Sequence, residues 1–232
     1  MILERENSLN NISCANCDGN KNFLIKNLDK TNLHCLDKHK SEIQLKAKNI
    51  IYSEGAFANA AFCINSGSLK LYSISGNGRS HIVKIVGKGD IIGFNELLTN
   101  SPYFLTAETL EDVYACRINK NNFFEILETN KSLKDYLIHQ ISFENRGLIN
   151  DVILISNQSV FQRLAYILLM LNDFYKNEGI NLTRQDLADF VGASKENIIR
   201  ELSYLKKQKI ISIQNRLIHV KNFPALKHII SK

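Results

Sequence analysis

Five cysteines carry the most distinctive chemistry of this 232-residue chain, and two of them, Cys14 and Cys17, lie three positions apart. Two thiols at this spacing can hold one metal centre or act as a redox pair. Two incidental cysteines in an N-terminal arm are the alternative. An odd number of cysteines argues against a structural disulfide framework in a reducing compartment. The pair therefore predicts a metal-binding or redox role for residues 1–22.

A second set of side chains is suited to reading the edges of DNA bases. Lys195, Glu196, Ile199 and Arg200 follow Ser194, whose hydroxyl can cap the start of a helix. An Arg side chain is suited to O6 and N7 of guanine, and a Glu side chain can accept from N4 of cytosine. The alternative is an ordinary helical hairpin on which these charges form a solvated face.

Two short amphipathic helices around Gly192 position these side chains. The first begins at a capping box formed by Thr183 and Asp186. The expected buried positions are Leu187, Phe190 and Val191 in the first helix and Ile198, Leu202 and Leu205 in the second. This layout is a helix-turn-helix, whose second helix enters the major groove. The expected DNA-binding residues are Thr183, Arg184, Gln185, Ser194, Lys195, Glu196, Asn197, Ile199 and Arg200.

The residues that follow predict a β-hairpin, which would complete a winged helix. Two short alternating segments, 210–213 and 217–220, flank the turn residues Gln214, Asn215 and Arg216. Charge agrees with this interpretation, because residues 181–232 hold ten Lys and Arg and four Asp and Glu. Ten minus four is +6, which equals the net charge of the whole chain. The positive field therefore lies on the C-terminal segment, where double-stranded DNA would be bound.

Length and composition limit the class of protein. A chain of 232 residues with 44% hydrophobic residues is expected to form two domains with real cores. No apolar run reaches the length of a membrane span. The start of the chain carries Glu4 and Glu6 where a signal peptide would be basic and then apolar. We therefore expect a cytoplasmic protein without a membrane partner.

The middle of the chain predicts a β-rich domain. From residue 43 to residue 118, short alternating segments lie between turn signals, as at Ser75-Gly-Asn-Gly78 and Gly87-Lys-Gly89. Regular spacing of strands and turns is typical of a sandwich or jelly roll. No Ser-His-Asp or Cys-His arrangement is recognisable, so we do not expect an enzyme.

A long helix is expected after this domain. From residue 133 to about residue 156, apolar residues recur at three-, four- and seven-residue steps: Leu137, Ile141, Leu148, Val152 and Ile155. Such a narrow stripe suits a two-stranded coiled coil, and packing on its own β-domain is the alternative. We favour a homodimer, because helix-turn-helix proteins usually bind two half-sites related by two-fold symmetry.

The expected fold is therefore α+β, in four parts. Residues 1–22 form a cysteine-containing arm, 23–130 a β-roll (jelly-roll) sensor domain, 131–158 a dimerisation helix, and 159–232 a winged helix-turn-helix domain.

This order of elements resembles the CRP/FNR family of bacterial transcription regulators, over nearly the whole chain. The most specific pieces are Thr183-Arg-Gln-Asp-Leu, Val191-Gly-Ala-Ser-Lys-Glu-Asn, and Arg200 with Leu205. The resemblance implies that Lys195, Glu196 and Arg200 contact the operator. Ile199 departs from the family pattern, because this position is often polar in the FNR branch, and Lys195 stands where the cyclic-AMP branch has an arginine.

The resemblance also bears on the ligand of the β-roll. Cyclic-nucleotide binders of the family have a Glu soon after a Gly of the roll and an Arg about ten residues later. Here Phe94 and Asn95 follow Gly93, and no Lys or Arg occurs between Lys88 and Arg117. A phosphate without a cation beside it would lose its charge-assisted hydrogen bonds. We therefore expect no binding of cyclic AMP.

The segments Gly93-Phe-Asn95 and Glu108-Thr-Leu-Glu-Asp-Val-Tyr-Ala-Cys116 are similar instead to the oxygen-sensing FNR branch. In that branch, a cysteine matching Cys116 joins three N-terminal cysteines to hold a 4Fe-4S cluster, which needs four thiolates. Cys14 and Cys17 match the first two, but Phe23 stands where the third is expected. Cys35 flanks an apolar stripe and suits a packed thiol; it can be the fourth ligand only if its helix faces the arm. Whether Cys35 or Cys63 is a ligand stays open.

Three hypotheses for the signal follow. The first is an iron–sulfur (4Fe-4S) cluster on Cys14, Cys17, Cys116 and Cys35, which would sense oxygen, redox state or NO. The second is a thiol/disulfide switch that uses Cys14, Cys17 and Cys116. The third is a regulator without redox function, with another small ligand in the roll or none.

The sequence thus predicts a homodimeric DNA-binding transcription regulator with RNA polymerase as a second partner and a two-fold operator as its site. A signal at the cysteines would change the orientation of the long helices and so the spacing of the two DNA-reading heads. A rival of another class is a ligand-binding β-roll protein whose C-terminal module binds another protein.

Overall fold

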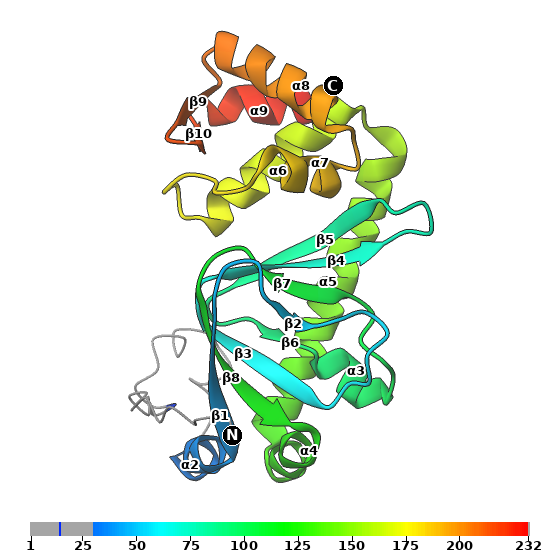
Figure 1. The fold of residues 1–232 in the computed structure, drawn as a ribbon, viewed down its shortest axis with the longest axis vertical. Coiled ribbons are helices and arrows are strands. Elements are labelled where there is room, and N and C mark those ends of the chain that lie inside the picture. Colours follow the sequence, from blue (N-terminus) through cyan, green and yellow to red (C-terminus); the bar gives the residue numbers. More distant parts are fainter. Residues whose placement is uncertain (1–13, 15–29, 232) are drawn as a thin grey trace, which may run out of the picture. The chain divides into compact units, whose positions relative to one another are not determined.

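The computed structural model describes residue 14 and residues 30–231 (Figure 1). The chain divides into two compact units. The first comprises residues up to 71 together with 85–141, and the second comprises 72–84 together with 142–232. This division falls within a helix, so the expected domain boundaries at 22/23, 130/131 and 158/159 stay predictions.

Two four-stranded sheets build the β-rich part. One has the order β1-β8-β3-β6 and the other the order β2-β7-β4-β5. The strands of the first sheet are β1 (Lys40–Leu45), β8 (Val113–Asn119), β3 (Ala60–Ser66) and β6 (Ile91–Ile92), and each neighbouring pair is antiparallel. The strands of the second are β2 (Ile50–Tyr52), β7 (Thr106–Thr109), β4 (Ser68–Ile74) and β5 (Ser80–Gly87).

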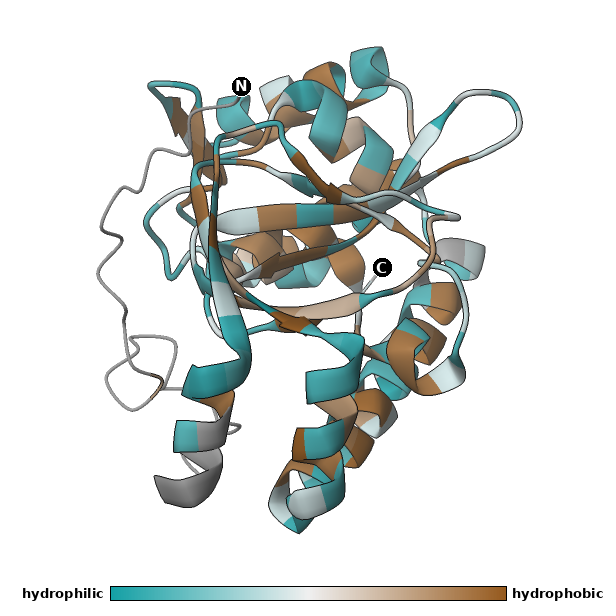
Figure 2. Ribbon diagram, turned by 60° about the horizontal axis from the view of Figure 1, so that its bottom comes forward, coloured by the Kyte–Doolittle hydropathy of each residue, from teal (hydrophilic) through white to brown (hydrophobic). Residues whose placement is uncertain are grey.

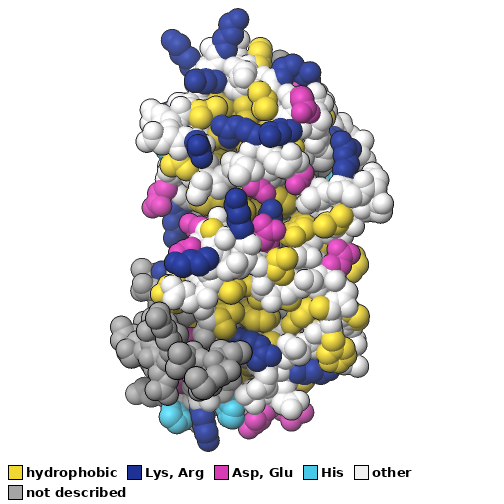
Figure 3. Space-filling view, in the orientation of Figure 1, with side chains coloured by type: hydrophobic (Ala, Val, Ile, Leu, Met, Phe, Trp, Pro, Cys, Tyr) yellow, Lys and Arg dark blue, Asp and Glu magenta, His cyan; other side chains and the backbone are white. Residues whose placement is uncertain are grey.

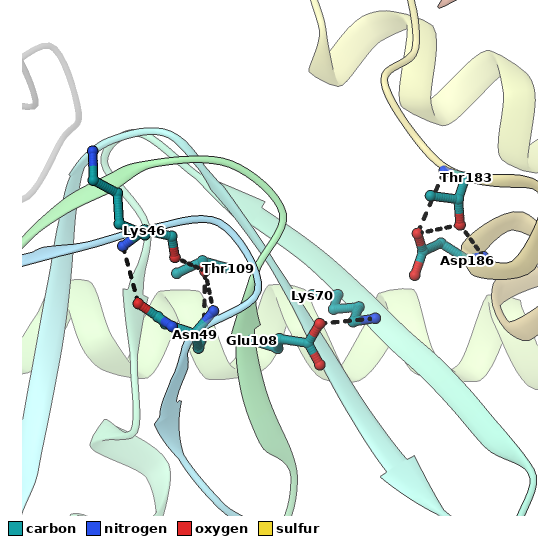
Figure 4. A network of polar contacts seen from close by, with 7 residues as sticks. All are labelled: Lys46, Asn49, Lys70, Glu108, Thr109, Thr183 and Asp186. Carbon is teal, nitrogen blue, oxygen red and sulfur yellow. Dashed lines mark hydrogen bonds and ion pairs between the residues drawn. The ribbon is translucent and has the colours of Figure 1, made fainter. Parts of the chain in front are cut away.

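Side chains along each strand point alternately toward the core of the first unit and away from it, and the inward ones fill this core. Ile64 of β3, Leu69 of β4 and Ala107 of β7 are 0% exposed, so both sheets contribute to one apolar interior. Figure 2 shows hydrophobic and hydrophilic residues interspersed along the strands and helices, as this burial requires. Two polar side chains also bond to the backbone of Lys46 beside β1 and β7: Asn49 accepts from the Lys46 N–H at 3.1 Å, and the Thr109 hydroxyl donates to the Lys46 carbonyl at 2.6 Å (Figure 4).

Short helices flank these sheets. They are α2 (Lys30–His39), α3 (Phe94–Thr99) and α4 (Lys120–Thr129). Asn119 caps α4 by accepting from the Asn122 N–H at 2.9 Å. Gly93 precedes α3 with a φ of 76°, and a Cβ there would lie 3.0 Å from the carbonyl oxygen of Ala60 and from the Tyr103 ring. Glycine is therefore required where the chain turns from β6 into α3.

The long helix is α5 (Lys131–Asn157), as the periodicity predicts. Its two ends differ in burial. Leu133 and Leu137 are 5% and 2% exposed in the core of the first unit, so Leu137 belongs to that core and not to an exposed stripe. Beyond them, large apolar side chains are exposed by 39–76%: Ile138, Ile141, Phe143, Leu148, Ile149, Val152 and Ile153. The side chain of Ile155 lies outside the described residues.

The second unit contains four more helices and a hairpin. They are α6 (Val160–Phe174), α7 (Arg184–Val191), α8 (Lys195–Lys207), β9 (Ile211–Gln214), β10 (Leu217–Val220) and α9 (Phe223–Ile230). Leu168 of α6, Leu187 of α7 and Leu226 of α9 are 0% exposed, so these helices share one interior. Helix α9 is not among the elements expected from the sequence, although Pro224 at its start suits a helix N-terminus.

The expected α+β fold is confirmed: a β-roll, a long helix and a winged helix-turn-helix follow one another along the chain. Within the described residues, no helix is long and apolar enough to span a membrane.

Candidate functional site

The first helix of the helix-turn-helix, α7, is fixed at both ends by local hydrogen bonds. The Thr183 hydroxyl accepts from the Asp186 N–H at 3.0 Å, and the Asp186 carboxylate accepts from the Thr183 N–H at 3.3 Å (Figure 4). This is the capping box that the sequence predicts. Gly192 ends the helix with a φ of 70°, and the Ala193 N–H returns to the Ala188 carbonyl. Local sequence signals therefore mark the turn into α8.

Burial of α7 differs slightly from the prediction. Leu187 and Val191 are buried as expected, but Ala188 is fully buried while Phe190 is only partly covered. A small residue at position 188 allows close packing, which the apolar pattern of larger side chains does not reveal.

The second helix, α8, buries one stripe and exposes the residues at its start. Ser194 caps it by accepting from the Asn197 N–H at 3.2 Å. The stripe is buried as predicted, with Ile198, Leu202 and Leu205 each at most 1% exposed. Because these residues fix the rotation of the helix, its outer face is set by packing.

The outer face of α8 carries the side chains that the sequence predicts to contact DNA bases. Lys195, Glu196 and Arg200 are exposed, and Ile199 is 45% exposed between them. Arg200 lies against Glu201, with 3.2 Å between Nη2 and Oε1, while its side chain stays 69% exposed. An ion pair this exposed contributes little to stability and can exchange for another anion. Lys195 and Glu196 form no described salt bridge.

The other expected contact residues lie at the starts of the two helices. Thr183 and Gln185 are exposed at the first turn of α7, and Gln185 donates to Asp189 at 2.8 Å. Arg184 is half-buried, and burial lowers its pKa below the ordinary value of an arginine. Ser194 and Asn197 are also half-buried and meet in the cap of α8.

Arg163 holds the turn between the two helices, which the sequence analysis missed. Its guanidinium donates to the carbonyls of Val191 at 3.0 Å, Gly192 at 3.4 Å and Gln158 at 2.9 Å. Carbonyls at the end of a helix lack intrahelical partners, and a guanidinium satisfies several at once. Nothing in the local sequence around α6 signals these acceptors, which lie up to 29 residues away.

The wing is the hairpin of β9 and β10, with Gln214 paired to Leu217. The sequence predicts a three-residue turn, but the turn has two residues, Asn215 and Arg216, because Gln214 belongs to the strand. Their φ angles are 49° and 71°. Positive φ at both central positions is the pattern of a type I′ turn, which matches the twist of the strands.

Positive side chains surround these elements. Figure 3 shows several Lys and Arg side chains over the upper part of the view, where Figure 1 draws α6 to α9 and the hairpin. The exposed cations that follow the start of α8 are Lys206, Lys207, Lys209, Arg216, Lys221 and Lys227. They lie on α8, on the wing and its flanks, and on α9, as a phosphate-binding surface requires.

A second cluster, in the first unit, brings together Cys14, Cys116 and Lys40. The Lys40 ammonium donates to the Cys14 sulfur at 3.6 Å and pairs with Asp37 at 3.0 Å. Its side chain is only 3% exposed. Cys116 is buried on β8 and interacts electrostatically with both Cys14 and Lys40. Asn65 donates to the Cys116 sulfur at 3.4 Å.

Protonation in this cluster follows from burial and charge. Burial and a hydrogen bond with Asp37 raise the pKa of Cys14 to about 12, although the charge of Lys40 opposes them. Burial lowers the pKa of Lys40, but the hydrogen bond with Asp37 and the charges of Cys14 and Cys116 raise it overall. The cluster is therefore a thiol pair beside a fixed cation.

Comparison with known proteins places the chain in a family. Residues 42–130 match the cyclic nucleotide-binding domain, and residues 162–229 match the Crp-like helix-turn-helix domain. The anaerobic regulatory protein of Bacillus subtilis is 30% identical over 189 residues, which cover 77% of this chain and 78% of that protein. The chain belongs to the CRP/FNR family of transcriptional regulators.

Further relatives cover more of the chain. The anaerobic regulatory protein of Pasteurella multocida is 26% identical over 225 residues, 93% of this chain and 81% of that protein. Among solved structures, FixK2 from Bradyrhizobium japonicum has a TM-score of 0.75 at 22% identity, over 82% of this chain and 96% of that chain. A CRP/FNR-family regulator from Thermus thermophilus has a TM-score of 0.66 at 20% identity, over 83% and 99%.

Some of the cysteines expected to hold a 4Fe-4S cluster lie in the thiol cluster. The described residues bring together Cys14 and Cys116, which are two of the expected ligands. They contain no group of three or more His, Cys, Asp or Glu side chains placed to hold a metal ion. Cys17 and the side chain of Cys35 lie outside the described residues. The described part of the chain therefore fits half of a four-thiolate site.

Proposed function

We propose that two copies of this regulator pair through α5 and bind a two-fold duplex site with the exposed start of α8. The observation that carries the proposal is the rotation of α8. Its buried stripe directs Lys195, Glu196 and Arg200 outward together. A helix that presents forked and charged groups at its N-terminal end suits the major groove. RNA polymerase is the expected second partner on the promoter.

Each side chain has a defined role in this proposal. Arg200 exchanges its exposed pairing with Glu201 for O6 and N7 of a guanine. Glu196 accepts from a cytosine amino group, and Lys195 supplies a point charge to a base or phosphate. Ile199 offers an apolar contact, which suits a thymine methyl group. The other expected contacts position the two helices on the sugar–phosphate backbone of the DNA. They are Thr183, Arg184, Gln185, Ser194 and Asn197.

The test is the change Arg200→Ala. Selection from a random duplex pool first gives the preferred site, and binding is then measured on this site and on a scrambled duplex. We expect specific binding to weaken by about 1–3 kcal/mol, while binding to the scrambled duplex changes little. Arg79→Ala is the matched control, because Arg79 is an exposed arginine in the turn between β4 and β5. Equal loss on both duplexes, or equal loss in the control, would count against base reading by α8.

We further propose that the N-terminal cysteines set DNA affinity in response to oxygen, redox state or NO. Two relatives are named anaerobic regulatory protein, which supports a signal of this class. Cys14 and Cys116 are the pair at the centre of the sensor, with Cys17 and Cys35 as further expected ligands. A 4Fe-4S cluster, when bound, would supply an oxygen-labile centre. Without iron, Cys14 and Cys116 would form a disulfide beside Lys40.

Anaerobic purification separates these two chemistries. For the cluster we expect a brown protein that absorbs at roughly 400 nm and bleaches in air. Cys116→Ser should abolish the colour, and Cys63→Ser, which changes a neighbouring thiol, should keep it. A colourless protein without iron that forms a disulfide between Cys14 and Cys116 on oxidation would contradict the cluster and support the switch. Titration with cyclic AMP should leave DNA affinity unchanged.

A further inference from the structure

Cys63 and Cys116 lie directly opposite each other in the first sheet. Cys63 is on β3 and Cys116 on β8, and the register of these antiparallel strands pairs their Cα atoms. Residues directly opposite each other share a face of the sheet. That face is the outer one, because the alternate residues Ile64 and Ala115 are 0% and 1% exposed in the core.

The hydrogen bonds of β3 define the spacing of the pair. The Ile64 N–H donates to the Asp90 carbonyl, and the Ile64 carbonyl accepts from the Gly89 N–H. The peptide groups of Ile64 thus face the β6 side, so those of Cys63 face β8. Opposite residues of this hydrogen-bonded kind have Cα atoms about 5.5 Å apart. A disulfide spans Cα separations of about 4.4–6.8 Å.

The two thiols differ in access. Cys63 is partly exposed, whereas Cys116 is 6% exposed and its sulfur accepts from Asn65. A small oxidant therefore meets Cys63 first, while Cys116 is held on the same face ready to react with the product. Such a pair of an accessible thiol and a neighbouring resolving thiol is typical of redox-sensitive cysteines.

We propose that Cys63 and Cys116 form a second redox pair, which a peroxide converts to a cross-strand disulfide between β3 and β8. Hydrogen peroxide transfers one oxygen to the Cys63 sulfur, which becomes a sulfenic acid as one water leaves. The Cys116 sulfur then attacks the Cys63 sulfur, the S–O bond breaks, and the oxygen leaves as a second water with the thiol proton. In sum, two thiols and one peroxide give one disulfide and two waters.

The consequence of this bond concerns Cys14. Cys116 can bond to only one partner, so the disulfide with Cys63 withdraws its sulfur from Cys14 and from any shared metal centre. Peroxide would thus act on the regulator by a route that does not need Cys17. This consequence for DNA binding rests on the proposed function, whereas formation of the bond does not.

Peptide mapping of the full-length protein tests the bond itself. The reduced protein is treated with hydrogen peroxide, its remaining thiols are alkylated, and it is digested with trypsin without reduction. Cleavage at Lys and Arg places Cys63 in residues 49–70, Cys116 in residues 89–117, and Cys14 with Cys17 in residues 6–21. We expect a linked 49–70/89–117 species that excess dithiothreitol removes. Linkage of 89–117 to 6–21 with Cys63 still alkylated, or no linkage of 89–117, would overturn the proposal.

Variants sharpen the result and separate it from the proposed function. Cys14→Ser should keep the linked species, and Cys63→Ser should lose it. Cys116→Ser should leave a Cys63 sulfenic acid that dimedone traps. On the selected duplex, peroxide should weaken binding of the wild type by about 5- to 150-fold, the usual range of coupling between sites, and the loss should be smaller in Cys63→Ser, which keeps only the N-terminal cysteines and Cys116. A linked species in a protein that never binds DNA would refute the proposed function alone; a DNA-binding protein without the link would refute the redox pair alone.

Discussion

At the scale of single residues, the tip of the wing has an unfavourable backbone conformation. Arg216 has a φ of 71° in the type I′ turn, a conformation that favours glycine. A non-glycine residue in the left-handed region costs about 1–2 kcal/mol. An exposed cation at the tip of the wing would contact a phosphate, so we infer that arginine is kept at this position for its charge.

Arg216→Gly should therefore separate stability from binding. We expect the free energy of unfolding to rise by about 0.5–1 kcal/mol, because the turn loses its strain. The affinity for duplex DNA should fall at the same time. Arg216→Ala is the matched control, since it removes the charge and keeps the strained backbone. Chemical denaturation and DNA titration give both quantities, and a glycine variant no more stable than the alanine variant would contradict this account.

At the scale of elements, α5 has two roles along its length. Its first turns pack Leu133 and Leu137 into the first unit, and its later turns expose apolar side chains. In the exposed part, Ile138, Ile141, Leu148 and Val152 fit alternating steps of three and four residues, with the exposed Asn145 at the missing position. A single polar residue in such a series selects the register of a coiled coil.

Val152→Glu should weaken pairing of the two copies. The change places a charge in each half of the proposed apolar seam, and we expect a loss of at least about 2–3 kcal/mol in dimer affinity. Phe143→Glu is the matched control, because Phe143 is 76% exposed but lies outside the three–four series. Sedimentation equilibrium measures both. A dimer of parental affinity for Val152→Glu, or equal weakening by Phe143→Glu, would place the interface elsewhere.

At the scale of the whole molecule, charge is distributed unevenly. Residues 181–232 carry a net charge of +6, and the rest of the chain sums to zero. The binding of DNA by such a protein releases counterions from the phosphates, so its affinity falls steeply as salt rises. The salt dependence therefore reports how many cations of the second unit meet phosphates.

Lys209→Gln should reduce this dependence. Lys209 is exposed between α8 and β9, and loss of one phosphate contact lowers the slope of log affinity against log salt by about 0.9 for each copy. Lys134→Gln is the control, because Lys134 is an exposed lysine near the start of α5. DNA affinities measured over a salt series give the slope for each variant. An unchanged slope for Lys209→Gln would show that Lys209 does not contact a phosphate.

Local patterns in the sequence account for most of the fold and for the exposed face of α8 that is proposed to read DNA. The Thr183 capping box, Gly192, and the stripe of Ile198, Leu202 and Leu205 define the helix-turn-helix, because caps and helical periodicity act over a few residues. The sequence also shows which segment carries the net positive charge, because counting charged residues requires no knowledge of packing.

Only the tertiary structure decided which distant side chains meet. The sequence could not show that Lys40 reaches Cys14, that Arg163 holds the end of α7, or that Cys63 faces Cys116. Strand register and helix packing create these contacts between residues 26 to 53 positions apart. Such pairings depend on how the apolar faces of many elements fit together, and no local pattern contains that information.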